Sequence, residues 1–114
     1  MEFIKYLNYF NPKAFIIENV IGILSKKNID NIKIIDLIMN ELNKKYNCCI
    51  NKLYASDFQV PQNRRRVIII GIRKDLNIIP NEIKTINSID DRIPIKNVLL
   101  PRNEINVSYY LSEK

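Results

Sequence analysis

The stretch that decides the fold runs from Gln59 to Gly71 and reads QVPQNRRRVIIIG. A polar, arginine-dense turn leads directly into an apolar run that is typical of a buried β-strand. Because side chains alternate along an extended chain, Gln62, Arg64 and Arg66 share one face and Arg65 points to the other. Arginine offers a planar fork of charged donors to a carbonyl oxygen, a carboxylate or a phosphate. The stretch therefore predicts a focused guanidinium site, with a solvated strand start as the alternative.

A second apolar run ends in a carboxylate and an amide. Residues 14–18 read AFIIE, and Asn19, Val20 and Gly22 follow within four positions. In open α/β sheets, ligands bind in the crevice at the carboxyl ends of the strands. Glu18 is therefore a candidate functional residue, although a strand-end glutamate is also often an ordinary cap or a solvated loop residue.

Hydrophobic periodicity predicts three strands and two helices. Apolar residues recur at helical spacing before Asn11-Pro12, and again after a helix start near Asn28 or Asp30. After Asp75 the periodicity weakens, and proline and asparagine become frequent. The predicted elements are a helix over 3–10, a strand over 14–18, a helix from about 28 or 30 to 45, and strands over 48–54 and 67–72.

Taken together, Glu18-Asn19-Val20 after one strand and Pro61-Gln62-x-Arg64-x-Arg66 before another resemble the cytosine-C5 DNA methyltransferase family. The resemblance covers most of the chain. It includes the lead-in Pro12-Lys13-x-Phe15, the stretch ASDF at 55–58, the RKD at 73–75 and the tail YYLSEK at 109–114, which resembles the lead into the family's target-recognition region.

This resemblance implies an α/β fold, a partial Rossmann-like methyltransferase domain with about three strands and two helices of a doubly wound sheet. Residues 1–79 would be the C-terminal part of the catalytic domain. Residues 80–114 would be a connector toward a missing target-recognition region.

The resemblance also implies catalytic roles for three residues. Glu18 matches the carboxyl group that hydrogen-bonds N3 and the exocyclic amine of the flipped cytosine. Arg66 matches the arginine that reaches cytosine O2, and Arg64, on the same strand face, would support the catalytic loop or the DNA backbone. Such groups lower the barrier by meeting charge as it develops on the ring.

Two further residues belong to the substrate-binding part of this expected site. Asn19 and Gln62 are expected there, where they organise backbone turns more than they touch the base. Arg65 has the weakest claim, because the alternation of side chains sends it to the opposite face.

Two parts of the family's catalytic apparatus are not found in this sequence. The family's methyl donor is S-adenosylmethionine, held by a glycine-rich turn, and its nucleophile is a cysteine in a Pro-Cys pair before Glu-Asn-Val. The chain has two glycines, neither in such a turn, and Cys48 and Cys49 both follow Glu18 without a preceding proline. The cofactor-binding residues therefore stay unassigned, and the chain alone is expected to be inactive.

Composition adds limits on partners and location. The net charge is +6 with a pI near 9.4, which favours double-stranded DNA as a partner, although scattered lysines in an AT-rich coding sequence would give the same balance. No apolar run approaches about 18 residues and no signal peptide is visible, so we expect a soluble, cytoplasmic protein without membrane contact. With no histidine and two adjacent cysteines, no metal site is expected.

The sequence thus predicts a fragment or subunit of a DNA (cytosine-5-)-methyltransferase of the restriction-modification type, completed by a complementary N-terminal chain. One alternative is a catalytically inactive remnant, favoured by the position of Met1 inside a family helix, or a basic DNA-associating module. An unrelated basic α/β binding module is a further alternative.

Overall fold

The computed structural model describes residues 2–85, 88 and 91–109. It contains two helices, α1 (Glu2–Phe10) and α2 (Ile34–Leu42), and three strands, β1 (Ala14–Val20), β2 (Tyr46–Tyr54) and β3 (Arg65–Arg73). This confirms the predicted α/β arrangement of three strands and two helices. The expected tail resemblance at 110–114 lies outside the described residues.

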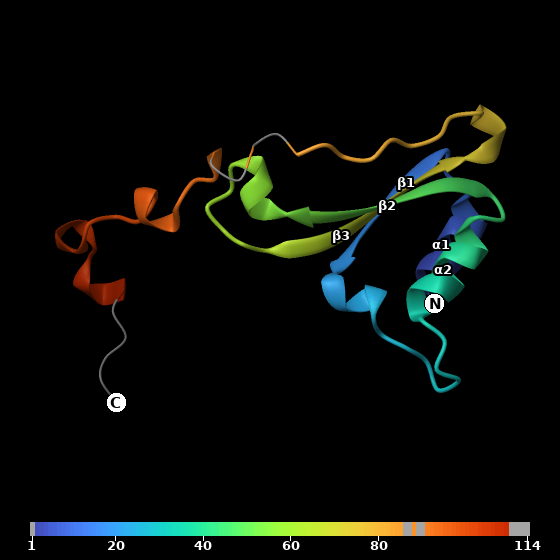
Figure 1. Cartoon of the computed structure of the whole chain (residues 1–114), viewed down its shortest axis with the longest axis horizontal. Helices are drawn as coiled ribbons and strands as arrows, with labels where there is room; N and C mark the ends of the chain where they lie inside the picture. Colours follow the sequence, from blue (N-terminus) through green and yellow to red (C-terminus); the bar gives the residue numbers. More distant parts are fainter. Residues whose placement is uncertain (1, 86–87, 89–90, 110–114) are drawn as a thin grey trace.

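The strands form one sheet in the order β1-β3-β2, and β3 is antiparallel to both neighbours (Figure 1). Strands β1 and β2 are therefore parallel to each other. As a result, the C-terminal ends of β1 and β2 meet the start of β3 at one end of the sheet. There, Arg66 of β3 pairs with Val20 of β1 on one side and with Leu53 of β2 on the other.

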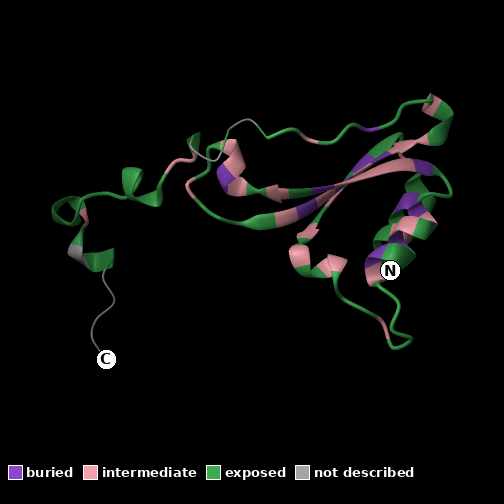
Figure 2. Cartoon of the chain, in the orientation of Figure 1, coloured by how far each residue is buried: buried purple, intermediate pink, exposed green. Residues whose placement is uncertain are grey.

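Both helices cover the same face of the sheet, and the core lies between the helices and this face (Figures 1 and 2). Its eight buried apolar residues are Leu7, Phe15, Ile35, Ile38, Leu42, Tyr46, Val67 and Ile69. Strand β3 runs through the middle of the sheet and alternates strictly. Val67, Ile69 and Gly71 are buried on the helix-covered face, and the intervening isoleucines are half-buried on the other.

Gly71 is required by close packing rather than by backbone conformation. The ring of Phe15, its partner on β1, lies across it, and an alanine Cβ at this position would fall 2.2 Å from Phe15 Cζ. The same ring contacts Tyr46 edge-on, with centroids 4.9 Å apart. A side chain at position 71 would therefore displace the aromatic centre of the core.

The second helix starts later than predicted. Asn28 does not cap a helix. Its Oδ1 accepts hydrogen bonds from the backbone N–H groups of Asp30 and Ile32, at 3.0 and 2.9 Å, and Asn31 adopts a left-handed conformation with φ 61°. Asparagine stabilises such turns as readily as it caps helices, and at position 28 it stabilises a turn. Helix α2 accordingly begins at Ile34.

The strands are longer than predicted. Strand β1 continues to Val20, so Glu18 lies inside the strand and not at its end. Strand β3 begins at Arg65, and β2 begins at Tyr46. Backbone pairing explains the difference, because each additional residue is paired with a residue on the neighbouring strand. The pattern of apolar side chains does not reveal these backbone contacts.

After Leu76 the described residues form short 3-10 turns, at 95–97, 102–104 and 107–109, and no further strand. Residues 77–85 run along the outer side of β2 (Figure 1). The side chain of Asn47 donates to the carbonyl of Ile78 at 2.9 Å, and that of Asn51 accepts from the N–H of Ile83 at 2.7 Å. This segment therefore fastens to β2, whereas β1 is hydrogen-bonded to β3 alone within the described residues.

Candidate functional site at the strand ends

The strand register brings Glu18 and Arg66 together. Glu18 pairs with Ile68 across the β1–β3 ladder, and Arg66 lies two residues before Ile68, so both side chains lie on the face that the helices leave open. Arg66 Nε lies 2.5 Å from Glu18 Oε1. The sheet therefore joins a carboxylate and a guanidinium from two separate motifs.

Backbone and burial restrain the arginine more than the glutamate. Arg66 Nη1 donates to the carbonyl of Arg65 at 2.8 Å, and the Arg66 side chain is 23% exposed against 56% for Glu18. The guanidinium is thus held on the sheet at two points. The carboxylate keeps one open side toward solvent, where a ligand can reach it.

Arg64 and Arg66 border the same hollow, of about 310 Å³, whose other lining is mostly apolar. Its wall is formed by Leu53, Tyr54, Ala55, Phe58, Ile68 and Ile83. Arg65 borders a different groove on the other side of the sheet. The arginines thus separate as the alternation of side chains predicts.

Asn19 and Gln62 are not brought to the Glu18–Arg66 pair. The Oδ1 of Asn19 accepts the backbone N–H of Val20 at 2.8 Å, and its side chain borders an apolar hollow on the helix-covered face. Gln62 lines a separate hollow together with Arg92 and Pro94. Neither side chain is hydrogen-bonded to Glu18 or Arg66 in the described part of the chain, and their expected place in the substrate pocket stays a prediction.

Neither cysteine takes part in the pair. Cys48 faces the helix-covered side opposite Gly71, and both cysteines are free thiols. Burial raises the pKa of the Cys48 thiol to about 11, which keeps it protonated at neutral pH. A protonated thiol is a weak nucleophile, so this residue does not substitute for the family's Pro-Cys nucleophile.

Sequence reasoning missed a tyrosine with two arginines near its ring at the same end of the sheet. The Tyr54 ring has the guanidinium of Arg65 at 5.9 Å on β3 and that of Arg92 at 6.0 Å from the later segment. Arg92 is also paired with Asp57, with Nε to Oδ1 at 2.8 Å. The signal for the first contact is the direct pairing of Tyr54 with Arg65 between β2 and β3, which only a strand register reveals.

Comparison with known proteins decides the family. A family model for C-5 cytosine-specific DNA methylases matches residues 1–112. The chain belongs to the C-5 cytosine-specific DNA methylase family. This confirms the resemblance drawn from Glu-Asn-Val and Pro-Gln-x-Arg-x-Arg.

Individual relatives agree. The chain is 46% identical over 77 residues to the type II methyltransferase M.FnuDI of Fusobacterium nucleatum, with 68% of this chain and 22% of the relative covered. It is 41% identical over 76 residues to M.DdeI of Desulfomicrobium norvegicum, with 66% and 18% covered. It is 32% identical over 100 residues to M.HhaI of Haemophilus parahaemolyticus, with 82% and 28% covered. The chain thus spans 18% to 28% of the length of these relatives.

A solved structure has the same fold over most of this chain. It is a prophage-encoded E. coli protein described as a DNA modification methyltransferase, superposing with a TM-score of 0.66 at 27% identity. The match covers 88% of this chain and 29% of that one. The β1-β3-β2 sheet with its two helices therefore has the fold of part of a DNA methyltransferase.

Two further properties bear on the kind of site. No helix in the described residues is long and apolar enough to cross a membrane. Within the same residues, no group of three or more cysteine, aspartate or glutamate side chains is placed to hold a metal ion.

Proposed function

We propose that this chain supplies half of the target-cytosine pocket of a DNA (cytosine-5-)-methyltransferase, with Glu18 and Arg66 as its catalytic residues. The observation that carries the proposal is the 2.5 Å contact between Arg66 Nε and Glu18 Oε1. In cytosine, N3 and the carbonyl carrying O2 are adjacent in the ring. An acid for N3 and a donor for O2 must therefore be neighbours, as these two side chains are.

The chemistry requires both groups. Methylation at C5 needs a thiolate to add to C6, which pushes electron density onto N3 and O2 of the ring. A carboxyl group at N3 and a guanidinium at O2 stabilise that density in the transition state. Without a base, Arg66 pairs with Glu18. With a flipped cytosine in place, Arg66 would donate to O2, and Glu18 would be free to engage N3 and the exocyclic amine.

Arg64 is proposed to support this pocket from the same face. It lines the hollow beside Arg66, whose apolar wall would lower the local dielectric around the base. Charged hydrogen bonds are stronger in such surroundings than in water. Asn19 and Gln62 are proposed to shape the neighbouring backbone turns.

The methyl donor of the complete enzyme is proposed to be S-adenosylmethionine, which supplies the electrophilic methyl group. The residues of this chain do not fit its main binding site. Gly22 lies in the 3-10 turn after β1, and Gly71 lies inside β3 under the Phe15 ring, so neither belongs to a glycine-rich turn. Cofactor binding is therefore assigned to the complementary N-terminal part of the catalytic domain.

The open face of the sheet is proposed as the docking surface for that part, on the same or another polypeptide. Ile16 is 69% exposed and Val20 is 54% exposed beside the half-buried Ile68 and Ile70. Exposed apolar rows of this kind mark interaction surfaces. Within the described residues, no strand pairs with the side of β1 away from β3, so its backbone groups there are open to a further strand.

A methyl-transfer assay tests the proposal. The chain is incubated with double-stranded DNA and S-adenosylmethionine labelled in the methyl group, alone and together with the N-terminal part of M.FnuDI. The segment of M.FnuDI that corresponds to this chain serves as positive control. We expect no incorporation by the chain alone and incorporation by the pair. Incorporation by the chain alone, or none by the pair when the positive control is active, would overturn the proposal.

The alternative function is a catalytically inactive, basic DNA-associating chain, and the net charge of +6 favours it. The same assay separates the two. A chain that binds DNA but never supports methyl transfer with an active N-terminal part fits the alternative.

A further inference from the structure

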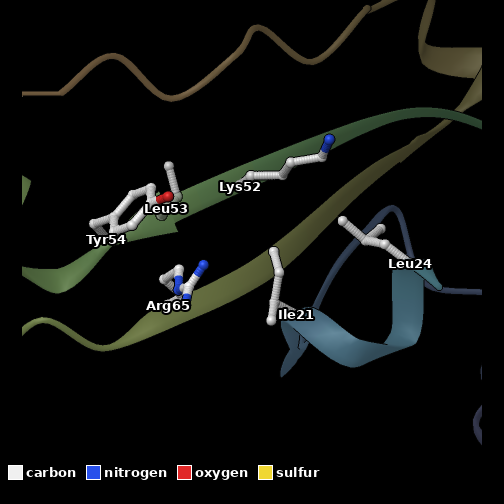
Figure 3. Close-up of a pocket in the computed structure, with 6 residues that line it drawn as sticks. All are labelled: Ile21, Leu24, Lys52, Leu53, Tyr54 and Arg65. Atoms are coloured by element: carbon white, nitrogen blue, oxygen red, sulfur yellow. The ribbon is translucent and has the colours of Figure 1, made fainter. Parts of the chain in front are cut away.

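A second site lies at the same end of the sheet, on the opposite face from Glu18. It is a groove of about 280 Å³ between the 3-10 turn after β1 and the ends of β2 and β3 (Figure 3). Ile21 and Leu24 of the turn form an apolar wall, and Lys52, Tyr54 and Arg65 of the strands form the polar one. Tyr54 also borders the hollow beside Arg66. The other four residues have no role in the proposed cytosine pocket.

The strand register explains why the polar residues gather. Lys52 and Tyr54 are two positions apart on β2, and Tyr54 pairs directly with Arg65 on β3. All three side chains therefore emerge on the helix-covered face, beyond the reach of α1 and α2. Arg65 is steadied there by the Tyr54 ring, whose centroid lies 5.9 Å from its guanidinium carbon.

The groove carries uncompensated positive charge. Both charged residues in its lining, Lys52 and Arg65, are cations, and both are exposed. The second guanidinium near the Tyr54 ring, that of Arg92, is balanced by its ion pair with Asp57. The two lining cations are thus the ones left to attract an anion.

Apolar and cationic walls together match a nucleic-acid backbone. A sugar is accommodated by apolar side chains, and phosphates by a guanidinium and an ammonium group. The groove lies at the strand ends that also carry Glu18 and Arg66, so a DNA strand that delivers a base to one face passes close to the other.

We propose that this groove binds the sugar-phosphate backbone of DNA, with Lys52 and Arg65 each neutralising one phosphate. The proposal rests on the proposed function for its choice of DNA as the polyanion. It gives Arg65, the arginine outside the cytosine pocket, a positioning role in DNA binding and not in methyl transfer.

The salt dependence of DNA binding tests this directly. Binding of the whole chain to a fluorescein-labelled duplex is measured by anisotropy from about 50 to 200 mM KCl, where each neutralised phosphate contributes about 0.9 to the slope of log K against log salt. Lys52→Gln and Arg65→Gln should each lower the magnitude of the slope by about 0.9, and the double variant by about twice that. The loss should be equal for duplexes of different sequence, because phosphate contacts carry no sequence information.

The matched control is Lys13→Gln, which removes the same charge at the other end of β1. It should leave the slope within experimental error of the unaltered chain. Slopes for Lys52→Gln and Arg65→Gln equal to that of the control would overturn the proposal. So would the absence of any binding of the chain to the duplex at the lowest salt concentration.

A second arm separates DNA from small anions. Inorganic triphosphate should compete with the duplex only weakly, because it offers charge without a sugar chain along the apolar wall. If the two variants lose triphosphate binding and keep the full DNA slope, the groove is a small-anion site and the proposal is wrong. Glu18→Gln should leave the slope of this chain unchanged while methyl transfer by the completed enzyme fails, so the two proposals fail independently.

Discussion

Arg66 Nε lies 2.5 Å from Glu18 Oε1, although the two residues belong to motifs on different strands. The contact depends on β3 pairing antiparallel with β1. That topology turns the start of β3 toward the C-terminal end of β1. Two motifs that are distant in sequence thereby form one ion pair.

The two neighbouring arginines should have different kinetic effects. In the completed enzyme, Arg66→Ala should lower kcat by about 100-fold or more, the usual cost of removing a donor to developing charge. Arg65→Ala should leave kcat nearly unchanged and raise KM for DNA, since its side chain lies on the opposite face. Steady-state methyl-transfer kinetics measure both. Equal losses of kcat would show that the strand register assigned to the site is wrong.

The close packing of Phe15 on Gly71 gives a stability prediction. Gly71→Ala should lower the free energy of unfolding by about 1–3 kcal/mol, because the added Cβ overlaps the Phe15 ring. Gly22→Ala is the matched control, since nothing lies within 4 Å of a Cβ there. Urea unfolding followed by circular dichroism compares the two. A Gly71→Ala chain as stable as the Gly22→Ala chain would contradict the packing described.

The open face of the sheet should make the isolated chain self-associate or bind apolar dyes. Ile16→Lys, which places a charge on the edge strand of that face, should reduce fluorescence of anilinonaphthalene sulfonate and shift the chain toward the monomer in sedimentation. Ile29→Lys makes the same change at a fully exposed loop position and serves as control. A sharp monomeric melt without dye binding in the unaltered chain would argue against a docking face.

The raised pKa of Cys48 predicts slow alkylation and a definite pH dependence of stability. In a Cys49→Ser variant, iodoacetamide should react slowly at pH 8 and faster as pH approaches the pKa of about 11. The folded state holds this proton more tightly than the unfolded state, whose pKa is near 9. The associated stability is therefore complete below pH 9 and lost between pH 9 and about 11. Rapid alkylation at pH 7 would contradict the burial of this thiol.

Much of the fold followed from local pattern. The isoleucine run after Arg66 predicted a central strand, and the spacing of Leu7 with its neighbours predicted α1. The start of α2 did not follow, because Asn28 stabilises a turn and a helix cap by the same kind of hydrogen bond. The continuous isoleucine run of β3 predicted cover on both faces, and within the described residues Ile68 and Ile70 are only half-buried on the face without helices.

The site was predictable in part for a physical reason. Side-chain alternation separated Arg65 from Arg64 and Arg66 without any structure. The basic groove was not predictable, because Lys52 and Tyr54 acquire meaning only when β2 pairs with β3 at Arg65. Strand pairing joins residues that are far apart in the chain, and local patterns in a single sequence do not predict it.

The most direct measurement of the central claim is methyl transfer by the completed enzyme carrying Glu18→Gln, with DNA affinity measured in parallel. Glutamine keeps the shape of the side chain and removes its acidity. Incorporation of labelled methyl groups should fall by about two orders of magnitude or more, and DNA affinity should stay as it was. Transfer at nearly the original rate would show that Glu18 is not the acid of a cytosine pocket.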